Sequence, residues 1–114
     1  MENWNQIKKS ARRSRERKGE ESEKKADMSL ELLLEQGTID AFWYDPKKDR
    51  TEGIDRVIQT RAGDELGIQI KSSKTGAEYH KKKFPHIPVI IVEYTDNTER
   101  IANKIKSVLR EKSF

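Results

Sequence analysis

The sequence predicts an α/β fold: a mixed central sheet flanked by helices, in the order helix, three strands, helix, strand, helix. Three observations predict it. Residues 64–74 ("DELGIQIKSSK") alternate apolar and polar side chains, as a half-buried strand does. Residues 20–37 and 96–112 carry apolar residues at helical spacing. The apolar run at 89–94 follows a helix-like segment, and a strand after a helical crossover is expected to run parallel to a neighbour.

Composition limits the chain to one small domain. The 114 residues are 39% charged and suffice for a single hydrophobic core. The absence of cysteine excludes a disulfide framework and a thiolate metal site. No apolar run approaches the roughly 20 residues that span a bilayer. The N-terminus lacks the apolar region of a signal peptide, so we expect a cytoplasmic protein.

The basic excess lies at the N-terminus. The chain has 24 Lys and Arg and 20 Asp and Glu. Residues 1–18 hold seven basic and two acidic residues, and the rest of the chain holds seventeen basic and eighteen acidic ones. We therefore divide the chain into a basic arm, 1–18, and a single domain, 19–114. Arg12, Arg13 and Arg15 are candidates for binding phosphates. A solvated tail is the alternative, and so is a helix docked on the domain, because Trp4, Ile7 and Ala11 have helical spacing.

The first half of the domain reads as a helix and a three-stranded meander. Ala26, Leu30 and Leu33 share one face of the helix at 20–37, and Gly37 is a natural stop. Strands are expected at 38–44, at 54–60 and in the stretch 64–74, of which the first is rich in β-branched and aromatic residues. Residues 45–53 read as a turn with a basic tip, and 61–65 as a hairpin turn. The three strands should be antiparallel neighbours.

The second half reads as helix, strand, helix. Thr75 and Glu78 form a capping-box pair that starts a short helix, which Pro85 and Pro88 end. The continuous apolar run at 89–94 is typical of a strand buried on both faces. In the last helix, Asp96 and Glu99 are placed to cap the start. Its apolar stripe comprises Ile101, Ile105, Val108 and Leu109.

One group of polar residues points to chemistry. Asp55 opens the second strand, and Gln69 and Lys71 project from the same side of the third. Asp55 falls opposite them unless the register slips by one residue. An acid, a second oxygen ligand and a lysine near a helix that carries Glu23 indicate a site for a divalent metal, because Mg²⁺ prefers hard oxygen ligands and retains several waters.

The segments "GIDRVI" and "GIQIKSSK" resemble the PD-(D/E)xK nuclease superfamily, whose restriction-endonuclease-like core has the element order αβββαβα. The resemblance covers about residues 19–110. It is nearest to Mrr-like and archaeal Holliday-junction-resolvase-like members, in which glutamine commonly replaces the acid of the motif. Ile54 stands where a proline is usual in the superfamily.

The resemblance implies roles for particular residues. Asp55 would be the metal-binding acid, Gln69 and the backbone carbonyl of Ile70 would complete the metal site, and Lys71 would be the catalytic lysine. The helix glutamate of this group often follows a glycine by four residues. Glu23 stands at that offset from Gly19, and Glu20 is the second choice.

These inferences predict an endonuclease that hydrolyses DNA phosphodiester bonds with Mg²⁺ or Mn²⁺. A structure-specific substrate is one option for it. Lys74, Lys81 and Lys82 are candidates for binding nucleic acid, with a solvated basic helix as the alternative. His80 is expected to be exposed, with a general-base role as the alternative. A homodimer or a protein partner is plausible because no specificity module is evident. The competing reading is a non-catalytic module that binds nucleic acid or protein on a nuclease fold. The neutral Gln69 and the acidic body of the domain favour that reading.

Overall fold

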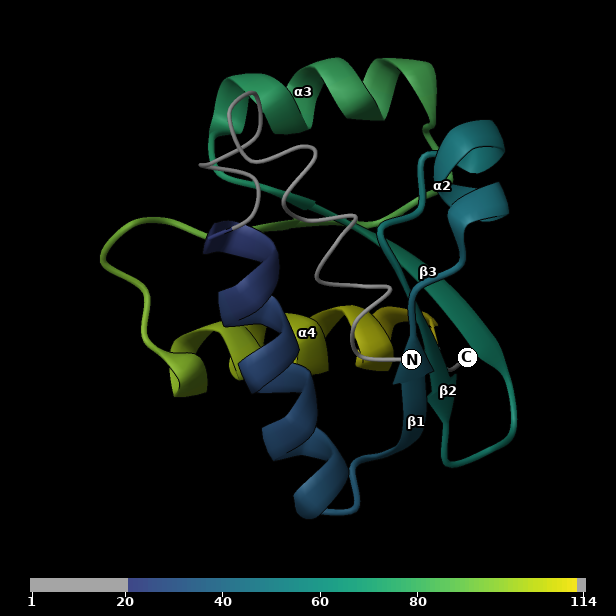
Figure 1. Ribbon diagram of the computed structural model, residues 1–114, viewed down its shortest axis with the longest axis vertical. Coiled ribbons are helices and arrows are strands. Elements are labelled where there is room, and N and C mark those ends of the chain that lie inside the picture. The colour runs from purple at the N-terminus through teal and green to yellow at the C-terminus, as the bar shows by residue number, and fades with distance from the viewer. Residues whose placement is uncertain (1–20, 113–114) are drawn as a thin grey trace, which may run out of the picture.

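The computed structural model describes residues 21–112 (Figure 1). A helix over residues 21–35 is followed by β1 (Ile39–Trp43), α2 (Pro46–Glu52), β2 (Arg56–Thr60), β3 (Glu65–Lys71), α3 (Lys74–Lys83), β4 (Val89–Ile91) and α4 (Thr98–Lys112). The predicted α/β class and element order are confirmed, with α2 as an addition. The predicted arm at 1–18 lies outside the described residues. No helix within 21–112 is long and apolar enough to cross a membrane.

The four strands form one mixed sheet in the order β1-β2-β3-β4. The pairs β1–β2 and β2–β3 are antiparallel, and β4 pairs with β3 in parallel, as the sequence predicted. In this register Arg56 lies opposite Ile68, and Ile70 lies beside Ile90. The strand β3 therefore has a neighbour on each side, and it carries two of the candidate residues, Gln69 and Lys71.

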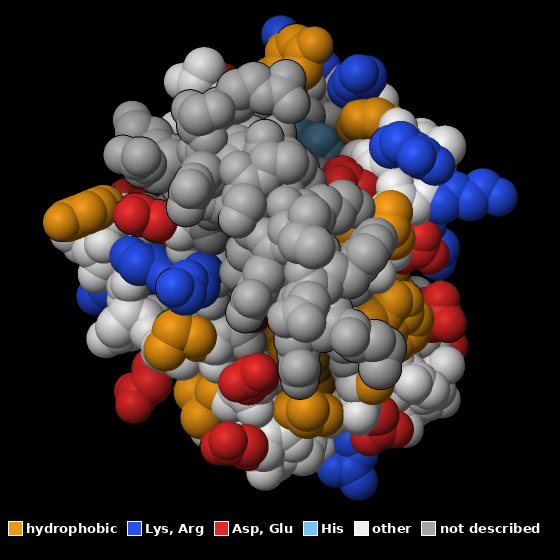
Figure 2. Space-filling view, viewed as in Figure 1, with side chains coloured by type: hydrophobic (Ala, Val, Ile, Leu, Met, Phe, Trp, Pro, Cys, Tyr) orange, Lys and Arg blue, Asp and Glu red, His pale blue; other side chains and the backbone are white. Residues whose placement is uncertain are grey.

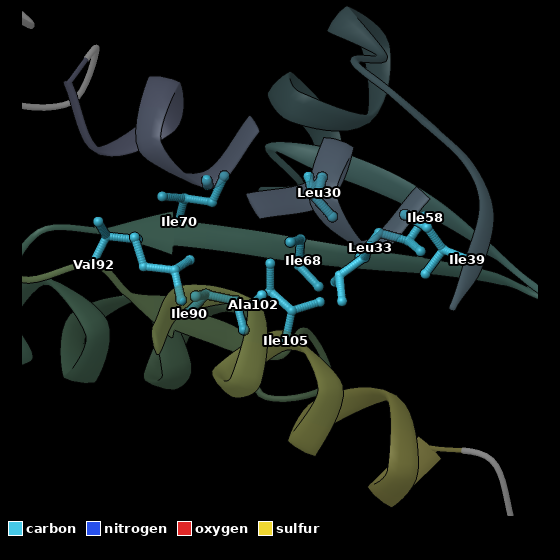
Figure 3. Packing of buried hydrophobic residues seen from close by; sticks show 12 residues of the cluster. Leu30, Leu33, Ile39, Ile58, Ile68, Ile70, Ile90, Val92, Ala102 and Ile105 are labelled. Carbon is cyan, nitrogen blue, oxygen red and sulfur yellow. The ribbon is translucent and has the colours of Figure 1, made fainter. Parts of the chain in front are cut away.

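The hydrophobic core lies on one face of this sheet (Figure 3). The helix at 21–35 contributes Leu30 and Leu33, and α4 contributes Ile105, all three completely buried. They pack against the strand residues Ile58, Ile68, Ile70 and Ile90. The apolar stripes expected for these two helices are confirmed. In Figure 1, α3 lies on the other side of the sheet. Its inward residues, Ala77 and His80, are not part of the core cluster.

The segment 45–53 is a short helix, α2, so the prediction of a simple turn was wrong. Asp45 caps its start, because the Asp45 carboxylate accepts hydrogen bonds from the N–H groups of Lys47 and Lys48 at 3.0 and 3.2 Å. Pro46 occupies the first turn, where its missing N–H costs nothing. Gly53 ends the helix with φ +69°, a left-handed conformation that glycine adopts readily.

Two predicted helix caps are displaced by one or two residues. The cap of α3 is Ser73, whose side chain accepts from the Gly76 N–H at 3.1 Å, and not Thr75. At the start of α4, Asn97 accepts from the Arg100 N–H at 2.8 Å. The neighbouring Asp96 turns inward instead, and Lys104 donates to its carboxylate at 2.7 Å. In each case a neighbouring polar residue is also of a type that caps helices, and the backbone conformation determines which of the two forms the cap.

The strand β4 is shorter and less buried than its sequence predicted. Only Val89–Ile91 pair with β3, and β4 lies at the edge of the sheet. Ile90 and Val92 point into the core, whereas Val89 and Ile91 are half-buried. The expectation of a strand that is buried on both faces was therefore wrong. The helix α3 covers only part of the second face.

A close contact across the sheet yields a first prediction. A Cβ atom added at Gly67 would lie 2.8 Å from Ile54 Cγ1 and 3.1 Å from Ile54 Cγ2. We expect Gly67→Ala to lower the free energy of unfolding by about 1–3 kcal/mol, because the buried Ile54 must move. Urea unfolding followed by circular dichroism measures this. In an Ile54→Ala background the same substitution should cost clearly less, and an equal cost in both backgrounds would disprove the packing argument.

Candidate functional site

The predicted site lies where the pairing of β2 with β3 ends. The last paired residues are Arg56 and Ile68, and Asp55 stands one residue earlier. The Asp55 N–H donates to the Ile68 carbonyl at 2.8 Å. The Asp55 Oδ2 atom accepts from the Ile70 N–H, also at 2.8 Å. These two hydrogen bonds bracket Gln69, so the structure brings Asp55 and Gln69 together across the strand pair.

Alternation along the strands places the candidate residues on two faces. Gln69 and Lys71 alternate with Ile68 and Ile70, so they project away from the core and toward the α3 side of the sheet. Gln69 is buried there, with 6% of its surface exposed, and Lys71 is half-buried. Arg56 lies opposite Ile68 and points to the core face, toward the helix at 21–35. Polar side chains therefore lie on both faces of the sheet at this end.

The Asp55 carboxyl has a strongly shifted protonation equilibrium. Burial raises its pKa to about 7, against the lowering effect of the Ile70 hydrogen bond. The negative charges of Glu23 and Asp49 raise the pKa further, and the positive charge of Arg56 lowers it. A buried acid whose pKa lies near neutrality is a feature of functional sites, because desolvation and like charges are arranged there to shift it.

Gln69 carries an oxygen that no residue within 21–112 satisfies. Its Oε1 atom is buried and has no hydrogen-bond partner. Leaving a buried acceptor unpaired costs about 1–3 kcal/mol, so a bound cation or water at this atom would stabilise the protein. The carbonyl of Ile70 lies on the same edge of β3 as the N–H that Asp55 binds, because both groups of one strand residue point to the same neighbour. Oxygen-bearing groups of Asp55, Gln69 and Ile70 therefore lie at this end of the strand pair.

Lys71 lies next to the first turn of α3. A Cβ atom built at Gly76 would lie 3.7 Å from Lys71 Cδ. The charge of Lys71 also contributes to lowering the pKa of His80, which places the ammonium in the same region. Lys71 has no salt bridge with another residue of the described chain. Its ammonium is thus available to an anionic ligand.

Glu23 reaches the end of the sheet from the core face. It accepts from Arg56 Nη1 at 3.1 Å, and the same guanidinium binds both carboxylate oxygens of Asp27 at 2.8 and 2.9 Å. Arg56 Nη1 also donates to the Asp55 carbonyl at 2.7 Å. Burial alone would lower the pKa of Arg56, but Asp27 and Glu23 outweigh it and raise the pKa, so the guanidinium stays charged. Glu23 therefore lies near Asp55, and Arg56 donates hydrogen bonds to both residues.

Sequence reasoning missed Arg56, Asp27 and Asp49. The sequence did contain a signal for Arg56. This arginine stands between Ile54 and Ile58 on one face of the predicted strand, and a charge among apolar residues needs an acidic partner. The partners themselves come from segments 29 and 33 residues away. Asp49 belongs to α2, which was expected to be a turn.

His80 is buried, so the expectation that it is exposed was wrong. Only 5% of its surface is accessible. Its Nε2 atom lies 3.0 Å from the Gly53 carbonyl, and since a carbonyl only accepts, Nε2 carries the proton. Burial lowers the pKa of His80, the hydrogen bond to Gly53 raises it, and the charges of Lys71 and Lys83 lower it. The neutral ring fastens α3 to the turn that precedes Asp55. Its Nδ1 atom is buried without a partner among the described residues.

The predicted nucleic-acid contacts of α3 are on the surface. Lys74, Lys81 and Lys82 are all exposed. Figure 2 shows Lys and Arg side chains gathered where the end of α3 meets α2. The two helices join there because Gly53 at the end of α2 packs against His80 and Phe84. Arg12, Arg13 and Arg15 belong to the segment that the structure does not describe.

The donor set at the end of the sheet suits a hard, hydrated cation. Within residues 21–112, no three His, Cys, Asp or Glu side chains gather as a metal-binding group. A cation at Asp55 would thus rely on few carboxylates, together with oxygens of Gln69 and Ile70. Mg²⁺ tolerates such a site because it retains several of its waters, whereas Zn²⁺ in a structural site takes four protein ligands.

Comparison with protein-family models, with curated proteins and with solved structures gave no match. The fold and the site therefore define the class of this protein by themselves. It is an α/β protein with a mixed four-stranded sheet flanked by helices, and a buried carboxyl lies at the end of its central hairpin.

The shifted pKa of Asp55 predicts how stability depends on pH. The pKa is about 7 in the folded protein and near 3.8 when Asp55 is exposed. The folded state therefore retains a proton that the unfolded state loses. Stability from this group is greatest below pH 4 and falls as the pH rises toward 7, by about 4 kcal/mol in all.

The Asp55→Asn variant isolates this effect, because asparagine retains an acceptor for the Ile70 N–H and does not ionise. In urea unfolding with EDTA, the stability of the variant relative to wild type should increase by about 1.4 kcal/mol per pH unit between pH 5 and 7. His80 titrates in both proteins, so its contribution cancels. A difference that does not change with pH would show that Asp55 ionises normally in the folded protein.

Proposed function

We propose that this domain is a metal-dependent endonuclease of the PD-(D/E)xK superfamily, nearest to its Mrr-like and Holliday-junction-resolvase-like members. The proposal includes DNA as substrate, a cytoplasmic location and association with either a second copy or a protein partner. The element order supports it: an antiparallel meander, a helix, a parallel strand and a final helix. In the superfamily the acid opens the second strand and the lysine motif lies in the third, and Asp55 and Lys71 hold those positions.

One observation carries the proposal. The carboxylate of Asp55 binds the backbone of Ile70 beside the unpaired oxygen of Gln69, two residues from the ammonium of Lys71. A strand end with only a structural role needs the hydrogen bond between Asp55 and Ile70, but it needs neither an unpaired buried oxygen nor a nearby ammonium. We infer that together these groups would form an oxygen-lined position next to a cation, an arrangement that suits phosphodiester hydrolysis.

Asp55, the Gln69 side chain, the Ile70 carbonyl and Glu23 would hold the Mg²⁺ or Mn²⁺ ion. The unpaired Oε1 of Gln69 fits this role, because it is a buried oxygen without a described donor. The ion would supply positive charge at the scissile phosphate and increase the acidity of the attacking water. The protein itself supplies the position of these groups.

The residues of the chain divide the remaining work. Asp55 is ionised above pH 7 and presents a carboxylate whose orientation the Ile70 N–H fixes. Lys71 stabilises the negative charge that develops on the phosphate. Arg56 holds Glu23 near Asp55 and keeps the helix at 21–35 on the end of the sheet. The exposed lysines of α3 bind phosphates next to the cleaved bond.

A cleavage assay tests the mechanism. With Mg²⁺ or Mn²⁺ and branched, flapped and linear DNA, we expect wild type to cut at least one substrate. The variants Asp55→Asn and Lys71→Met should each reduce the rate at least about 100-fold, because each removes a group that acts on the reacting phosphate. Lys106→Met is the matched control, since it removes a lysine from α4 at the other end of the sheet. Cleavage that survives in either site variant would rule out this mechanism.

A second candidate function is a non-catalytic module that binds nucleic acid or a protein on the same fold. The observation that favours it is the engagement of Glu23 with Arg56, which leaves Asp55 as the nearest acid to a neutral Gln69. Titration with Mg²⁺ and Mn²⁺ separates the two candidates. Intact DNA binding without metal binding or cleavage would establish the module.

The basic arm gives a further prediction for either candidate. Replacing Arg12, Arg13 and Arg15 by glutamine should weaken duplex binding and reduce the slope of log K against log salt by about 3. Deleting residues 1–18 should reduce that slope by up to about 6, because seven positive charges are lost. Fluorescence anisotropy at several salt concentrations measures both. An unchanged slope would show that the arm makes no phosphate contacts.

A further inference from the structure

An aromatic ring stands exposed on α3. Tyr79 has 70% of its surface accessible, whereas Ala77 and His80 on the same helix are buried. The ring therefore points away from the sheet. Tyr94 is also exposed, but Lys25 lies over its ring at 5.5 Å from the ring centre. Within the described chain, no such cation or second ring covers Tyr79. The outer face of α3 is thus available to a flat partner.

Lysines follow this ring along the helix. Lys82 and Lys83 come three and four residues after Tyr79, one turn further on, and the Lys83 ammonium lies over the Phe84 ring, 5.5 Å from its centre. The helix Lys74–Lys83 holds four lysines and a single acid, Glu78. Figure 2 shows positively charged and hydrophobic side chains next to each other along the rim over α3. An exposed ring among ammonium groups is the composition of a surface that binds single-stranded nucleic acid.

The ring and the candidate site share one turn of α3. A helical side chain leans toward the N-terminus and covers the preceding turn, which for Tyr79 is the turn at Gly76. Gly76 has no side chain there, and a Cβ atom at Gly76 would lie 3.7 Å from Lys71 Cδ. One helical turn rises about 5.4 Å. A strand whose phosphate meets Lys71 therefore passes next to Tyr79.

We propose that Tyr79 is a stacking platform for an unpaired nucleobase. In a continuous duplex both faces of each base are covered by its neighbours, so a surface ring gains a partner only at an end, a flap, a bulge or a junction. The substrate class of the site is therefore nucleic acid with unpaired bases next to the cut. The placement of that base beside Lys71 rests on the proposed function, whereas stacking itself can be tested without cleavage.

Binding without metal tests the platform. The full-length protein is titrated in EDTA into short single-stranded DNA that contains 2-aminopurine, whose fluorescence falls when it stacks. Tyr79→Ala should bind this strand about tenfold more weakly and abolish the quenching, because one base loses its aromatic partner. Tyr79→Phe should retain both. Tyr94→Ala is the matched control, since it removes another exposed tyrosine, from a different surface, and it should behave as wild type.

A relaxed, covalently closed circular duplex, which has no ends, completes the test. Its affinity should be the same for wild type and Tyr79→Ala. Equal losses on both substrates, unchanged affinity and quenching in Tyr79→Ala, or no binding of single strands by wild type would each overturn the proposal. The failure of the nuclease proposal looks different. In that case metal-dependent cleavage is absent while the difference between Tyr79→Ala and Tyr79→Phe remains.

Discussion

One hydrogen bond organises the end of this sheet. The strand β3 extends past the last residue that β2 pairs with, so the N–H of Ile70 faces a position without a backbone acceptor from β2. A buried N–H left unpaired costs about as much as a lost hydrogen bond. The Asp55 carboxylate accepts it at 2.8 Å. The Asp55 carboxyl group thus pairs the Ile70 N–H that β2 leaves without a backbone partner. The need for this acceptor explains why an acid lies at the end of the strand pair.

Burial of that acid determines the chemistry around it. Ile54 packs against Gly67, and His80 fastens the turn at Gly53 to α3, so water has little access to Asp55. The pKa rises to about 7 because the charged form is poorly solvated. A cation placed beside the carboxylate would reverse this, since its charge replaces the lost hydration.

Much of this architecture was predictable because its signals are local. Alternation in residues 64–74 and the stripe through Leu30 and Leu33 reflect strand and helix geometry directly. The short hairpin turn determines that β2 and β3 are neighbours, so the approach of Asp55 to Gln69 could be predicted without a structure. The helix α2 was missed because "DPKKDRTEG" offers turn residues that also serve as caps.

The contacts that the sequence did not predict depend on distant segments. Whether Ser73 or Thr75 caps α3 depends on a backbone angle, since both side chains are suitable. The burial of His80 depends on the close approach of Gly53, 27 residues earlier. Arg56 pairs with Glu23 and Asp27 because the helix at 21–35 crosses the core face near the start of β2. No spacing within one element contains that information.

Two unpaired acceptors on the α3 side distinguish this sheet end from an ordinary one. Gln69 Oε1 and His80 Nδ1 are both buried without a described partner. Each costs about 1–3 kcal/mol relative to an apolar residue of the same shape. A fold that needed only the bond to Ile70 would be more stable with a neutral acceptor in place of Asp55 and apolar side chains in place of the other two. Asp55 lowers stability near neutral pH, and the unpaired atoms of Gln69 and His80 lower it as well. Each of the three residues offers a lone pair on the α3 side of the sheet. Groups that cost stability and are directed to one side of the sheet are typical of ligand sites, and this supports the proposed site between the end of β3 and α3.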